Sequence, residues 1–462
     1  MEGYLLIDFG STYTKLTAVD IENEEIIGTA KAITTIEKDI MIGFNNAYEI
    51  LFNQIKNKNV EFTTKLACSS AAGGLKMVAI GLVPELTAEA AKRAALGAGA
   101  RVLKVYSYDL TLKEIAEIKN SNLDIILLAG GTDGGNKDCI IHNAKMLAEN
   151  SVKIPIVAAG NKVAEDEVNR IFKEAGLFYK ITDNVMPKLN VLNVEPAREE
   201  IRKIFMDKII VAKGMNNAEN YIDGILMPTP AAVLKAAKVL SEGSDREEGV
   251  GDLVVVDIGG ATTDVHSISE GEPSKSGVTM RGLEEPFAKR TVEGDLGMRY
   301  SAISLLESAS TKKLQRYLTD KNINIEENCR YRSENIKMIP TKDEEIIFDE
   351  AMAKVAVEIS MERHSGVLET VFTPCGIIYS QVGKDLLDVK YLIGTGGVLV
   401  HSKEPGEILK AGIYNESDPT HLKPEKPEYL IDKTYIMSAM GLLAEQYPDI
   451  AVRIMKKYLV KV

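Results

Sequence analysis

The chain has 462 residues, with 67 acidic against 55 basic side chains, a formal net charge of −12 and 45% hydrophobic residues. This length suffices for two or three domains with sizeable cores, and the negative charge argues against nucleic acid or an anionic membrane as the main partner. No apolar run approaches the ~18 residues of a membrane span, and a predicted strand follows Met-Glu-Gly without a signal peptide, so we expect a cytoplasmic protein.

The first predicted strand ends on a carboxylate. Tyr4–Ile7 is a short apolar run, and Asp8-Phe-Gly-Ser-Thr-Tyr-Thr-Lys15 follows it. Glycine lets backbone amides approach a phosphate, hydroxyl groups donate to its oxygens, lysine adds positive charge, and a strand-end aspartate can hold a metal ion through water. The candidates are Asp8 and Lys15 for catalysis, Asp8 for metal, and Gly10, Ser11, Thr12 and Tyr13 for nucleotide binding.

Two further strands and a helix over 39–56 are expected next, and then alternating strands and helices over about 62–210. In that segment Lys65–Ser70 and Lys76–Leu82 are predicted to be neighbouring strands. Ala88–Ala98 is an alanine-rich helix, and Val102–Tyr106 is another strand. This alternation predicts a parallel α/β subdomain inserted into the first half of the chain.

A glycine-rich loop, Ala129–Asn136, follows the predicted strand Asp124–Leu128. Such a loop can cradle an anion or let a partner's backbone approach closely, and it can equally be a sharp strand-to-helix turn that the fold requires. Asp133 is a candidate polar contact in it. The pattern alone leaves these alternatives open.

A second strand-end aspartate occurs in the stretch Gly251–Val265, after a connecting helix over about 230–240 and a charged, glycine-rich link over 242–251. Leu253–Val256 is a β-branched run, and Asp257 ends it. The candidates are Asp257 and Asp264 for catalysis, Asp257 for metal, and Gly259, Gly260, Thr262 and Thr263 for phosphate. Because strand, aspartate, glycine and hydroxyl groups recur in this order, we predict two related halves, each supplying one loop to a shared triphosphate.

The rest of the second half has three notable features. Asp295 is expected to cap the next helix, and Asp343–Met361 reads as a longer helix. Gly394, Thr395, Gly396 and Gly397 form a second turn that could contact a nucleotide, and Thr434–Leu459 reads as terminal helices broken at Pro448. Cys68, Cys139, Cys329 and Cys375 form no Cys-x-x-Cys pair and are expected to be reduced and buried.

These motifs resemble the ATPase superfamily of actin, sugar kinases and heat-shock chaperones. Asp8-Phe-Gly-Ser-Thr is similar to its first phosphate motif, Asp257-Ile-Gly-Gly-Ala-Thr-Thr-Asp-Val to its second, and Tyr391-Leu-Ile-Gly-Thr-Gly-Gly-Val to its adenosine motif. Met227-Pro-Thr-Pro resembles the connecting helix, although Thr229 stands where the chaperones carry glutamate. The resemblance implies duplicated actin-like, ribonuclease H-like α/β domains around a nucleotide cleft, with ATP and Mg²⁺ as cofactors.

Three segments narrow the resemblance: Asp8–Lys15, the loop after Leu128, and Arg290-Thr-Val-Glu-Gly-Asp-Leu-Gly-Met-Arg299. Together they resemble the MutL or GlmL-type accessory proteins of glutamate mutase and related adenosylcobalamin-dependent aminomutases. That likeness implies an ATP-dependent reactivating factor with such a mutase as its client. A small-molecule kinase, a hydantoinase-type enzyme and an iron–sulfur-dependent dehydratase activator are alternatives. The sequence leaves the oligomeric state open.

The predicted domains follow from these motifs. The first actin-like domain covers 1–245, with the insertion at about 62–210, and the second covers 246–432. The helices of 433–462 are expected to pack back on the first domain, as the resemblance implies. Hydrolysis would need a water oriented by Asp257 or Asp264, and loss of the γ-phosphate would let the halves rotate.

Overall fold

The computed structural model describes residues 2–35, 39–70, 75–205, 222–318, 320, 323–373 and 376–462. They form two compact units: Met1–Val233 with Gly282–Pro286, and Leu234–Arg281 with Phe287–Val462. The division lies inside the helix α9 (Thr229–Glu242). Residues of the predicted link form the short strands β11 (Gly243–Ser244) and β12 (Glu247–Glu248), and the domain boundary at 245–246 stays a prediction.

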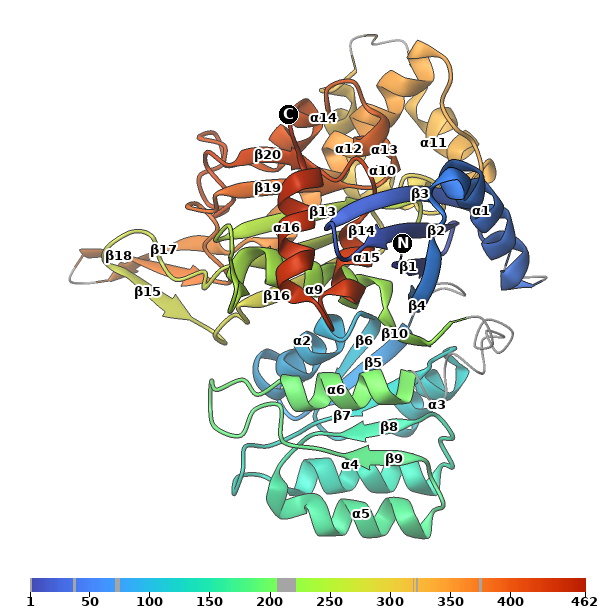
Figure 1. Cartoon of the computed structure of the whole chain (residues 1–462). Coiled ribbons are helices and arrows are strands. Elements are labelled where there is room, and N and C mark those ends of the chain that lie inside the picture. The colour runs from blue at the N-terminus through green and yellow to red at the C-terminus, as the bar shows by residue number, and fades with distance from the viewer. Residues whose placement is uncertain are drawn as a thin grey trace. The chain divides into compact units, whose positions relative to one another are not determined.

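The first unit is built on a five-stranded sheet of order β10-β4-β1-β2-β3 (Figure 1). Strands β1, β2 and β3 are joined antiparallel, whereas β4 and β10 run parallel to β1. Helix α1 packs on β2 and β3 through buried side chains that include Phe44 and Leu51, and the side chain of Asp39 caps it. The bounds are β1 Glu2–Phe9, β2 Tyr13–Asp20, β3 Glu25–Ile33, α1 Ile40–Ile55, β4 Glu61–Ser69 and β10 Gly224–Pro228.

A parallel sheet is inserted into the first half, as predicted, with the order β6-β5-β7-β8-β9. It lies between β4 and β10 in the chain, so β4, which the prediction included in the insertion, belongs to the first sheet instead. The central strands β5, β7 and β8 are mostly apolar and buried, and their alternate residues pack against α2 and α6 on one side and α3, α4 and α5 on the other (Figure 1). The bounds are β5 Leu75–Gly81, α2 Glu89–Gly97, β6 Ala100–Ser107, α3 Leu112–Asn120, β7 Ile125–Leu128, α4 Asp138–Glu149, β8 Ile156–Ala158, α5 Glu165–Glu174, β9 Tyr179–Ile181 and α6 Glu195–Ile204.

One prediction about this region is wrong. The strands predicted at Lys65–Ser70 and Lys76–Leu82 are not neighbours, because β4 pairs with β1 and β10 while β5 pairs with β6 and β7. The connecting residues 71–74 lie outside the described residues. Two consecutive strands suggest pairing, but each satisfies its hydrogen bonds in a different sheet, β4 in the mixed first sheet and β5 in the parallel inserted sheet.

The second unit repeats the arrangement of the first. Its sheet has the order β16-β14-β13-β19-β20-β21. Strands β13, β14 and β16 are antiparallel neighbours, and β19 and β20 run parallel to β13. The order of five strands in the second unit, β16-β14-β13-β19-β20, corresponds to β3-β2-β1-β4-β10 in the first. Corresponding neighbours are antiparallel or parallel in the same way in both units. The predicted duplication of ribonuclease H-like α/β domains is therefore confirmed at the level of topology.

Helix α12 (Asp343–His364) is the central helix of the second unit and packs on β13, β14 and β16. The remaining bounds in the sheet are β13 Leu253–Ile258, β14 Thr263–Ile268, β16 Ala288–Glu293, β19 Tyr391–Thr395, β20 Glu428–Ile431 and β21 Val460–Lys461. The helices are α10 Ala302–Gln315, α11 Ile325–Glu334, α13 Gly397–His401, α14 Pro405–Leu409, α15 Met437–Leu443 and α16 Pro448–Tyr458.

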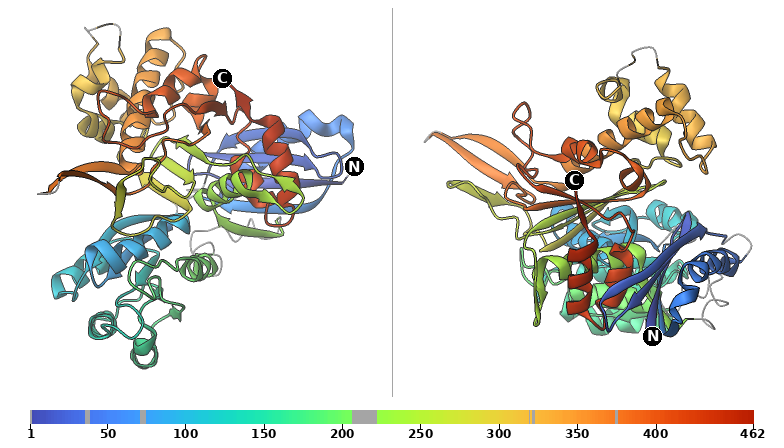
Figure 2. Two further views of the ribbon diagram at one scale, coloured as in Figure 1. Left: turned by 90° about the vertical axis from the view of Figure 1, so that its left-hand side faces the viewer. Right: turned by 45° about the horizontal axis from the view of Figure 1, so that its top comes forward.

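A separate three-stranded sheet, β15-β18-β17, belongs to the second unit. Figure 2 shows its β17–β18 ribbon extending away from α10 and α11 of the same unit. Its bounds are β15 Val278–Arg281, β17 Val367–Thr373 and β18 Gly376–Val382. Cys375 lies outside the described residues, whereas Cys68, Cys139 and Cys329 are free and buried, as predicted.

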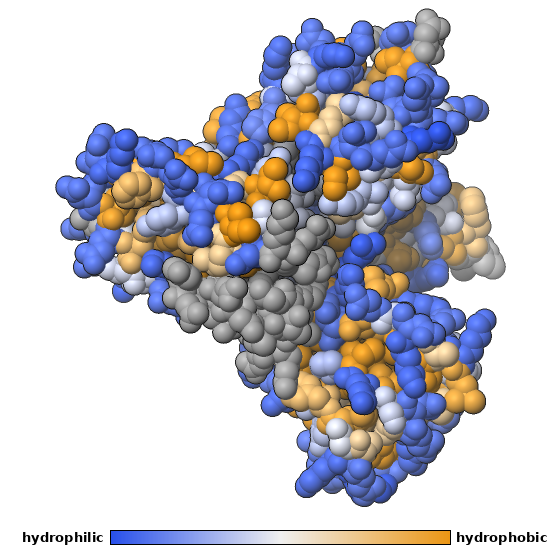
Figure 3. Space-filling view, turned by 90° about the vertical axis from the view of Figure 1, so that its right-hand side faces the viewer, coloured by the Kyte–Doolittle hydropathy of each residue, from blue (hydrophilic) through white to orange (hydrophobic). Residues whose placement is uncertain are grey.

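The terminal helices form as predicted, with the break before Pro448. In the second unit α16 contacts β11 and β12, and Lys456 forms an ion pair of 2.6 Å with Glu247. Packing of this segment on the first domain stays a prediction. No helix of the described chain is long and apolar enough to cross a membrane, and the face shown in Figure 3 carries mainly hydrophilic side chains.

Candidate functional site

The first candidate loop joins β1 to β2 and is held by a tight turn. The backbone N–H of Gly10 donates to the carbonyl of Tyr13 at 3.1 Å, and the Thr34 hydroxyl donates to the Gly10 carbonyl at 2.8 Å. A Cβ at Gly10 would lie 2.6 Å from the Tyr13 oxygen, so this turn requires glycine. Because the Gly10 amide is used within the turn, the amides of Ser11 and Thr12 are the ones that can face a phosphate.

Asp8 is buried at the end of β1, where groups from three other segments meet its carboxylate. The Thr229 hydroxyl donates to Oδ1 at 2.7 Å, the Cys68 thiol contacts Oδ1 at 3.7 Å, and the Lys15 ammonium lies 3.5 Å from Oδ2. Lys15 is opposite Asp8 in the β1–β2 register, and Cys68 is opposite it in the β1–β4 register. Asp8 and Lys15, predicted together from the sequence, are thus in contact.

Burial, with the nearby charge of Asp8, raises the pKa of the Cys68 thiol well above its usual value. This thiol therefore stays protonated and acts as a donor rather than as a nucleophile. The pKa of Lys31 is lowered by burial and by the positive charge of Lys15. Lys31 also lies 5.6 Å from the centre of the Tyr13 ring, which places a second cation next to this loop.

Sequence reasoning missed Cys68 and misread the position of Thr229. Thr229 was noted only as a departure from the chaperone pattern, yet its hydroxyl donates to Asp8 at 2.7 Å. Both residues come directly before or after the ends of parallel strands β4 and β10, which adjoin β1. A search for polar residues at the carboxyl ends of all predicted strands would have found them.

We expect Thr229→Val to lower the free energy of unfolding of the first unit by about 1.5–3 kcal/mol, because a hydroxyl that donates to a buried carboxylate is lost. Thr229→Ser, which keeps the donor, is the matched control and should lose much less. Urea titration followed by circular dichroism measures both. A Thr229→Val variant that loses no more stability than Thr229→Ser would contradict the role of the hydroxyl.

The second candidate loop joins β13 to β14 and repeats the geometry of the first. The N–H of Gly259 donates to the carbonyl of Thr262 at 2.9 Å, which is the turn that Gly10 makes with Tyr13. Asp257 is partly buried one residue before the end of β13, opposite Asp264 in the antiparallel register. With the Gly259 amide used in the turn, those of Gly260 and Ala261 can face a phosphate.

The turn that precedes α10 holds this loop through hydrogen bonds to its backbone. The Arg299 N–H donates to the Gly260 carbonyl at 2.8 Å, and the Ser301 hydroxyl donates to the Ala261 carbonyl at 2.7 Å. The Arg299 guanidinium in turn contacts the buried carboxylate of Asp349 at 2.7 Å, which also accepts from Arg332 at 2.6 Å. An ion network in the core of the second unit therefore anchors the loop.

The hydroxyl groups of this loop have different surroundings. Thr262 donates to Asp264 Oδ2 at 3.0 Å, whereas Thr263 is fully buried and donates to the Leu296 carbonyl at 2.7 Å. Asp264 accepts from Arg290 Nε at 2.8 Å and from Nη2 at 2.5 Å, with little exposure of either side chain. Both carboxylate oxygens of Asp264 are engaged, and Lys15 occupies the equivalent cross-strand position in the first unit.

The third candidate segment, 394–397, contains the last two residues of β19 and lies beside the second loop. Thr395 is opposite Asp257 in the parallel β13–β19 register, and its hydroxyl donates to Asp432 at 3.3 Å. Gly396 has φ +101°, and a Cβ there would lie 2.3 Å from the Ile258 carbonyl oxygen. Only glycine allows this close approach, which brings Gly394–Gly397 next to the end of β13. Two loops predicted separately thus meet at one edge of the second sheet.

Asp295 does not cap the following helix, so that prediction is wrong. The N-cap of α10 is Ser301, while Asp295 accepts from Ser308 at 2.6 Å and from Arg363 at 2.8 Å. Glu293 also accepts from Arg363, at 2.8 Å, and its pKa is raised by burial. The turn after β16 extends to Ser301, so Asp295 lies too early in the chain to cap the helix.

We expect the free energy of unfolding of the second unit to depend on pH, because two histidines, His266 and His364, are buried near Asp264. Burial, with the charge of Arg290, lowers the pKa of His266 to about 3, and burial with Lys289 and Lys384 lowers that of His364 well below 6.5. The folded unit keeps both neutral, whereas the unfolded chain binds protons below a pKa of ~6.5. Stability is therefore complete above ~6.5 and falls as the pH drops below it, by up to ~1.4 kcal/mol per pH unit for each histidine.

Urea unfolding at about pH 7 and pH 5.5, followed through the transition of the second unit, measures how steeply the free energy of unfolding changes with pH. His266→Leu removes one titrating group and should make the slope shallower, whatever its effect at pH 7. His142→Gln is the control, because His142 lies in the first unit and its replacement changes no group of the second. An unchanged slope in His266→Leu would contradict the assignment.

The comparisons with known proteins agree on one family. The family model described as MutL protein matches residues 4–459 of this chain. The chain is also similar to "Protein MutL" of Clostridium tetanomorphum, with 76% identity over 462 residues that cover 100% of both chains. Together these matches extend over the candidate loops and the inserted sheet.

Similarity to solved structures is much weaker. The activator of the 2-hydroxyisocaproyl-CoA dehydratase from Clostridium difficile aligns at 9% identity over 98% of this chain and 97% of its own, with a TM-score of 0.33. A xylulose kinase from Lactobacillus acidophilus aligns at 10% identity over 100% and 93%, with a TM-score of 0.36. The fold assignment therefore rests on the strand order described above.

Proposed function

Because the chain belongs to the MutL protein family, we propose that it is an ATP-dependent reactivating factor whose client is an adenosylcobalamin-dependent aminomutase such as glutamate mutase. The observation that carries the nucleotide part is the duplicated turn: each unit places an aspartate and a glycine turn at the end of the central strand of the same sheet. The client is proposed from the family resemblance.

The residues of both loops fit a nucleotide bound with Mg²⁺. Asp8 and Asp257 each provide one carboxylate at a strand end, which suits a metal ion held mainly through water. The turns leave the amides after Gly10 and after Gly259 for phosphate oxygens, and Lys15 adds a positive charge. When bound, Mg²⁺ would neutralise charge on the phosphates during hydrolysis.

We assign the orientation of the attacking water to Asp257 rather than Asp264. Asp264 has its oxygens engaged by Arg290 and Thr262, so it positions the loop. Asp8 is held by Thr229 and Cys68, which fixes the carboxylate without adding a competing negative charge. The loop at 394–397 lies against the end of β13, where it can contact the adenosine.

In this proposal the triphosphate bridges the two units, and hydrolysis removes the bridge. The units could then rotate, changing the surface offered to a client, as in other two-domain switches driven by a γ-phosphate. Exchange of damaged for intact cobalamin needs few conformational cycles, so slow hydrolysis is sufficient. Metal-free nucleotide should bind more weakly, because a bound Mg²⁺ would offset the negative charge of the phosphates near the carboxylates of Asp8 and Asp257.

The test is to incubate the purified protein with Mg-ATP, adenosylcobalamin and a glutamate mutase inactivated by damaged cobalamin, and to follow the return of mutase activity. We expect recovery with ATP but not with ADP or without nucleotide. Transfer of phosphate to glycerol or xylulose without any recovery would instead identify a kinase. Recovery that needs no nucleotide would contradict the proposed role of the two loops.

A further inference from the structure

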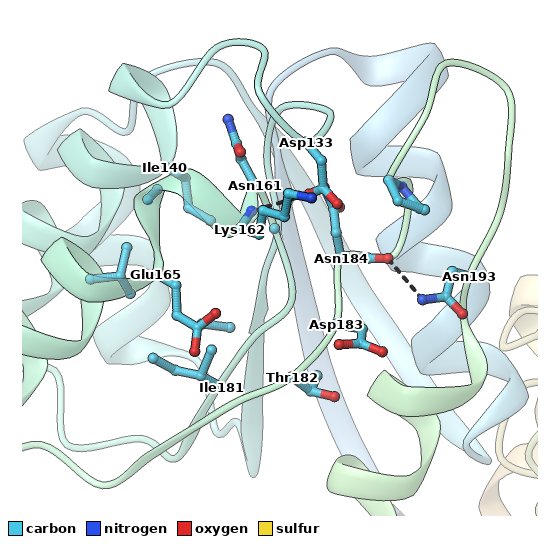
Figure 4. A pocket seen from close by; sticks show the side chains of 15 residues that line it. Asp133, Ile140, Asn161, Lys162, Glu165, Ile181, Thr182, Asp183, Asn184 and Asn193 are labelled. Carbon is cyan, nitrogen blue, oxygen red and sulfur yellow. Dashed lines mark hydrogen bonds between the residues drawn. The ribbon is translucent and has the colours of Figure 1, made fainter.

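A cavity of about 410 Å³ opens in the inserted α/β sheet, within the first unit and away from the β1–β2 loop in the chain (Figure 4). It lies where the loops after β7, β8 and β9 meet. Its polar lining includes Asp133, Asn161, Lys162, Glu165, Asp183 and Asn184. A volume of this size falls within the ~300–1,000 Å³ typical of small-molecule sites.

The position of the cavity is one that parallel sheets favour for ligands. All four pairings in the order β6-β5-β7-β8-β9 are parallel, so the strands present their carboxyl ends at the same edge. Open α/β sheets bind ligands outside these ends, where loops can vary without disturbing the core. Each of the last three strands contributes a loop to the cavity.

Two buried asparagines hold the rim in place. Asn161, which is 2% exposed, accepts from the Gly134 amide at 3.1 Å and donates to the Gly135 and Asn136 carbonyls at 3.0 and 3.1 Å. Asn184, 4% exposed, donates to the Gly131 carbonyl and to Asp133, both at 3.0 Å. The glycine-rich loop Ala129–Asn136 is thus fastened to the two loops beside it, and the cavity is preorganised.

The charges around the cavity are mostly negative. Asp133, Glu165 and Asp183 line it with three carboxylates, against the single ammonium of Lys162. Helix α5 begins here, and its first turn carries Glu165, Asp166 and Glu167, which offset the attraction that a helix N-terminus has for anions. The glycine-rich loop, one candidate for an anion cradle, therefore faces a site that disfavours anions.

The floor of the cavity is apolar. Ile140, Ala158, Val168 and Ile181 line it beneath the polar rim. In Figure 4, Ile140 and Glu165 lie on one side of the cavity, and Asp183, Asn184 and Asn193 lie on the other. An apolar floor with a few converging polar groups suits a ligand that has both a carbon skeleton and a charged end.

We propose that this cavity binds a small organic cation, with a protonated amine among the carboxylates of Asp133, Glu165 and Asp183 and with its carbon chain on the apolar floor. This site is separate from the nucleotide loops and does not depend on the function proposed for them.

The test compares the binding of two five-carbon compounds of opposite charge to the full chain without nucleotide. Isothermal titration with 1,5-diaminopentane should show binding, and glutarate, of the same length but opposite charge, should bind much more weakly or not at all. Asn-selective ¹⁵N labelling gives a second measurement, since the side-chain signals of Asn161 and Asn184 should shift with the diamine. Raising the salt concentration should weaken binding, because the carboxylates are partly exposed.

Glu165→Gln and Asp183→Asn should each weaken diamine binding by about 3- to 5-fold, as expected for exposed charge pairs. Asp166→Asn is the matched control, since Asp166 is exposed on the same turn of α5 but does not line the cavity. The proposal is overturned by any of these results: no binding of the diamine, equal binding of glutarate, displacement of the diamine by millimolar Mg²⁺, or equal effects of all three variants.

Discussion

Replacing Asp257 with asparagine is expected to lower the rate of ATP hydrolysis at least ~100-fold, because the strand-end carboxylate that would orient metal and water loses its charge while the backbone keeps its pairing with Asp264 and Thr395. A phosphate-release assay with saturating Mg-ATP measures this loss. Since the side-chain volume is unchanged, thermal stability should remain close to that of the parent protein.

Asp252 provides the control for this substitution. It immediately precedes β13, at the opposite end of the strand from Asp257, and burial raises its pKa. Asp252→Asn should therefore leave the hydrolysis rate within about 2-fold of the parent protein. Should the Asp257 variant hydrolyse ATP at the parent rate, the catalytic site would have to be elsewhere in the chain.

The largest effect on stability is expected at Asp349, beneath the second loop. Its carboxylate accepts from Arg299 at 2.7 Å and from Arg332 at 2.6 Å, and Arg332 is fully buried. Asp349→Ala leaves two guanidinium groups without this counter-charge, one of them in the core, which costs about 3–5 kcal/mol of unfolding free energy. Urea titration of the full chain should show the loss in the transition of the second unit.

Glu344→Gln is the matched change on the same helix, because Glu344 is exposed in the first turn of α12. It should cost less than ~1 kcal/mol. Since Arg299 also holds the Gly260 carbonyl through its backbone amide, the Asp349 variant should bind nucleotide more weakly even where it remains folded. Unaltered stability in Asp349→Ala would mean that water replaces the carboxylate at no cost.

Many elements could be predicted from local pattern. The helix expected over 39–56 is α1, the alanine-rich helix expected at Ala88–Ala98 is α2, and Pro448 predicted the break between the last two helices. Alternating strands and helices predicted the inserted parallel sheet. These features depend on residues close in sequence, so propensity, capping and periodicity are sufficient to reveal them.

Pairing between distant segments was less accessible. From the sequence, strand β5 could have paired with β4 in the first sheet. Only the parallel pairing of all five strands of the inserted sheet places β5 there. Similarly, the sequence could not show that Asp264 forms an ion pair with Arg290 of the neighbouring strand. Nor could it show that Asp295 forms an ion pair with Arg363 instead of capping a helix. Each of these contacts joins residues whose separation in the chain carries no local signal.

By itself, the sequence determined that two strand-end aspartates with glycine turns occur in two halves of the chain, because short-range chemistry specifies strand, turn and charge. The tertiary structure decided which groups surround them: Thr229 and Cys68 at Asp8, Thr395 opposite Asp257, and the Arg299–Asp349 pair below Gly260. The physical reason is that sheet order and helix packing, which bring these groups together, result from burying apolar faces of the whole chain at once.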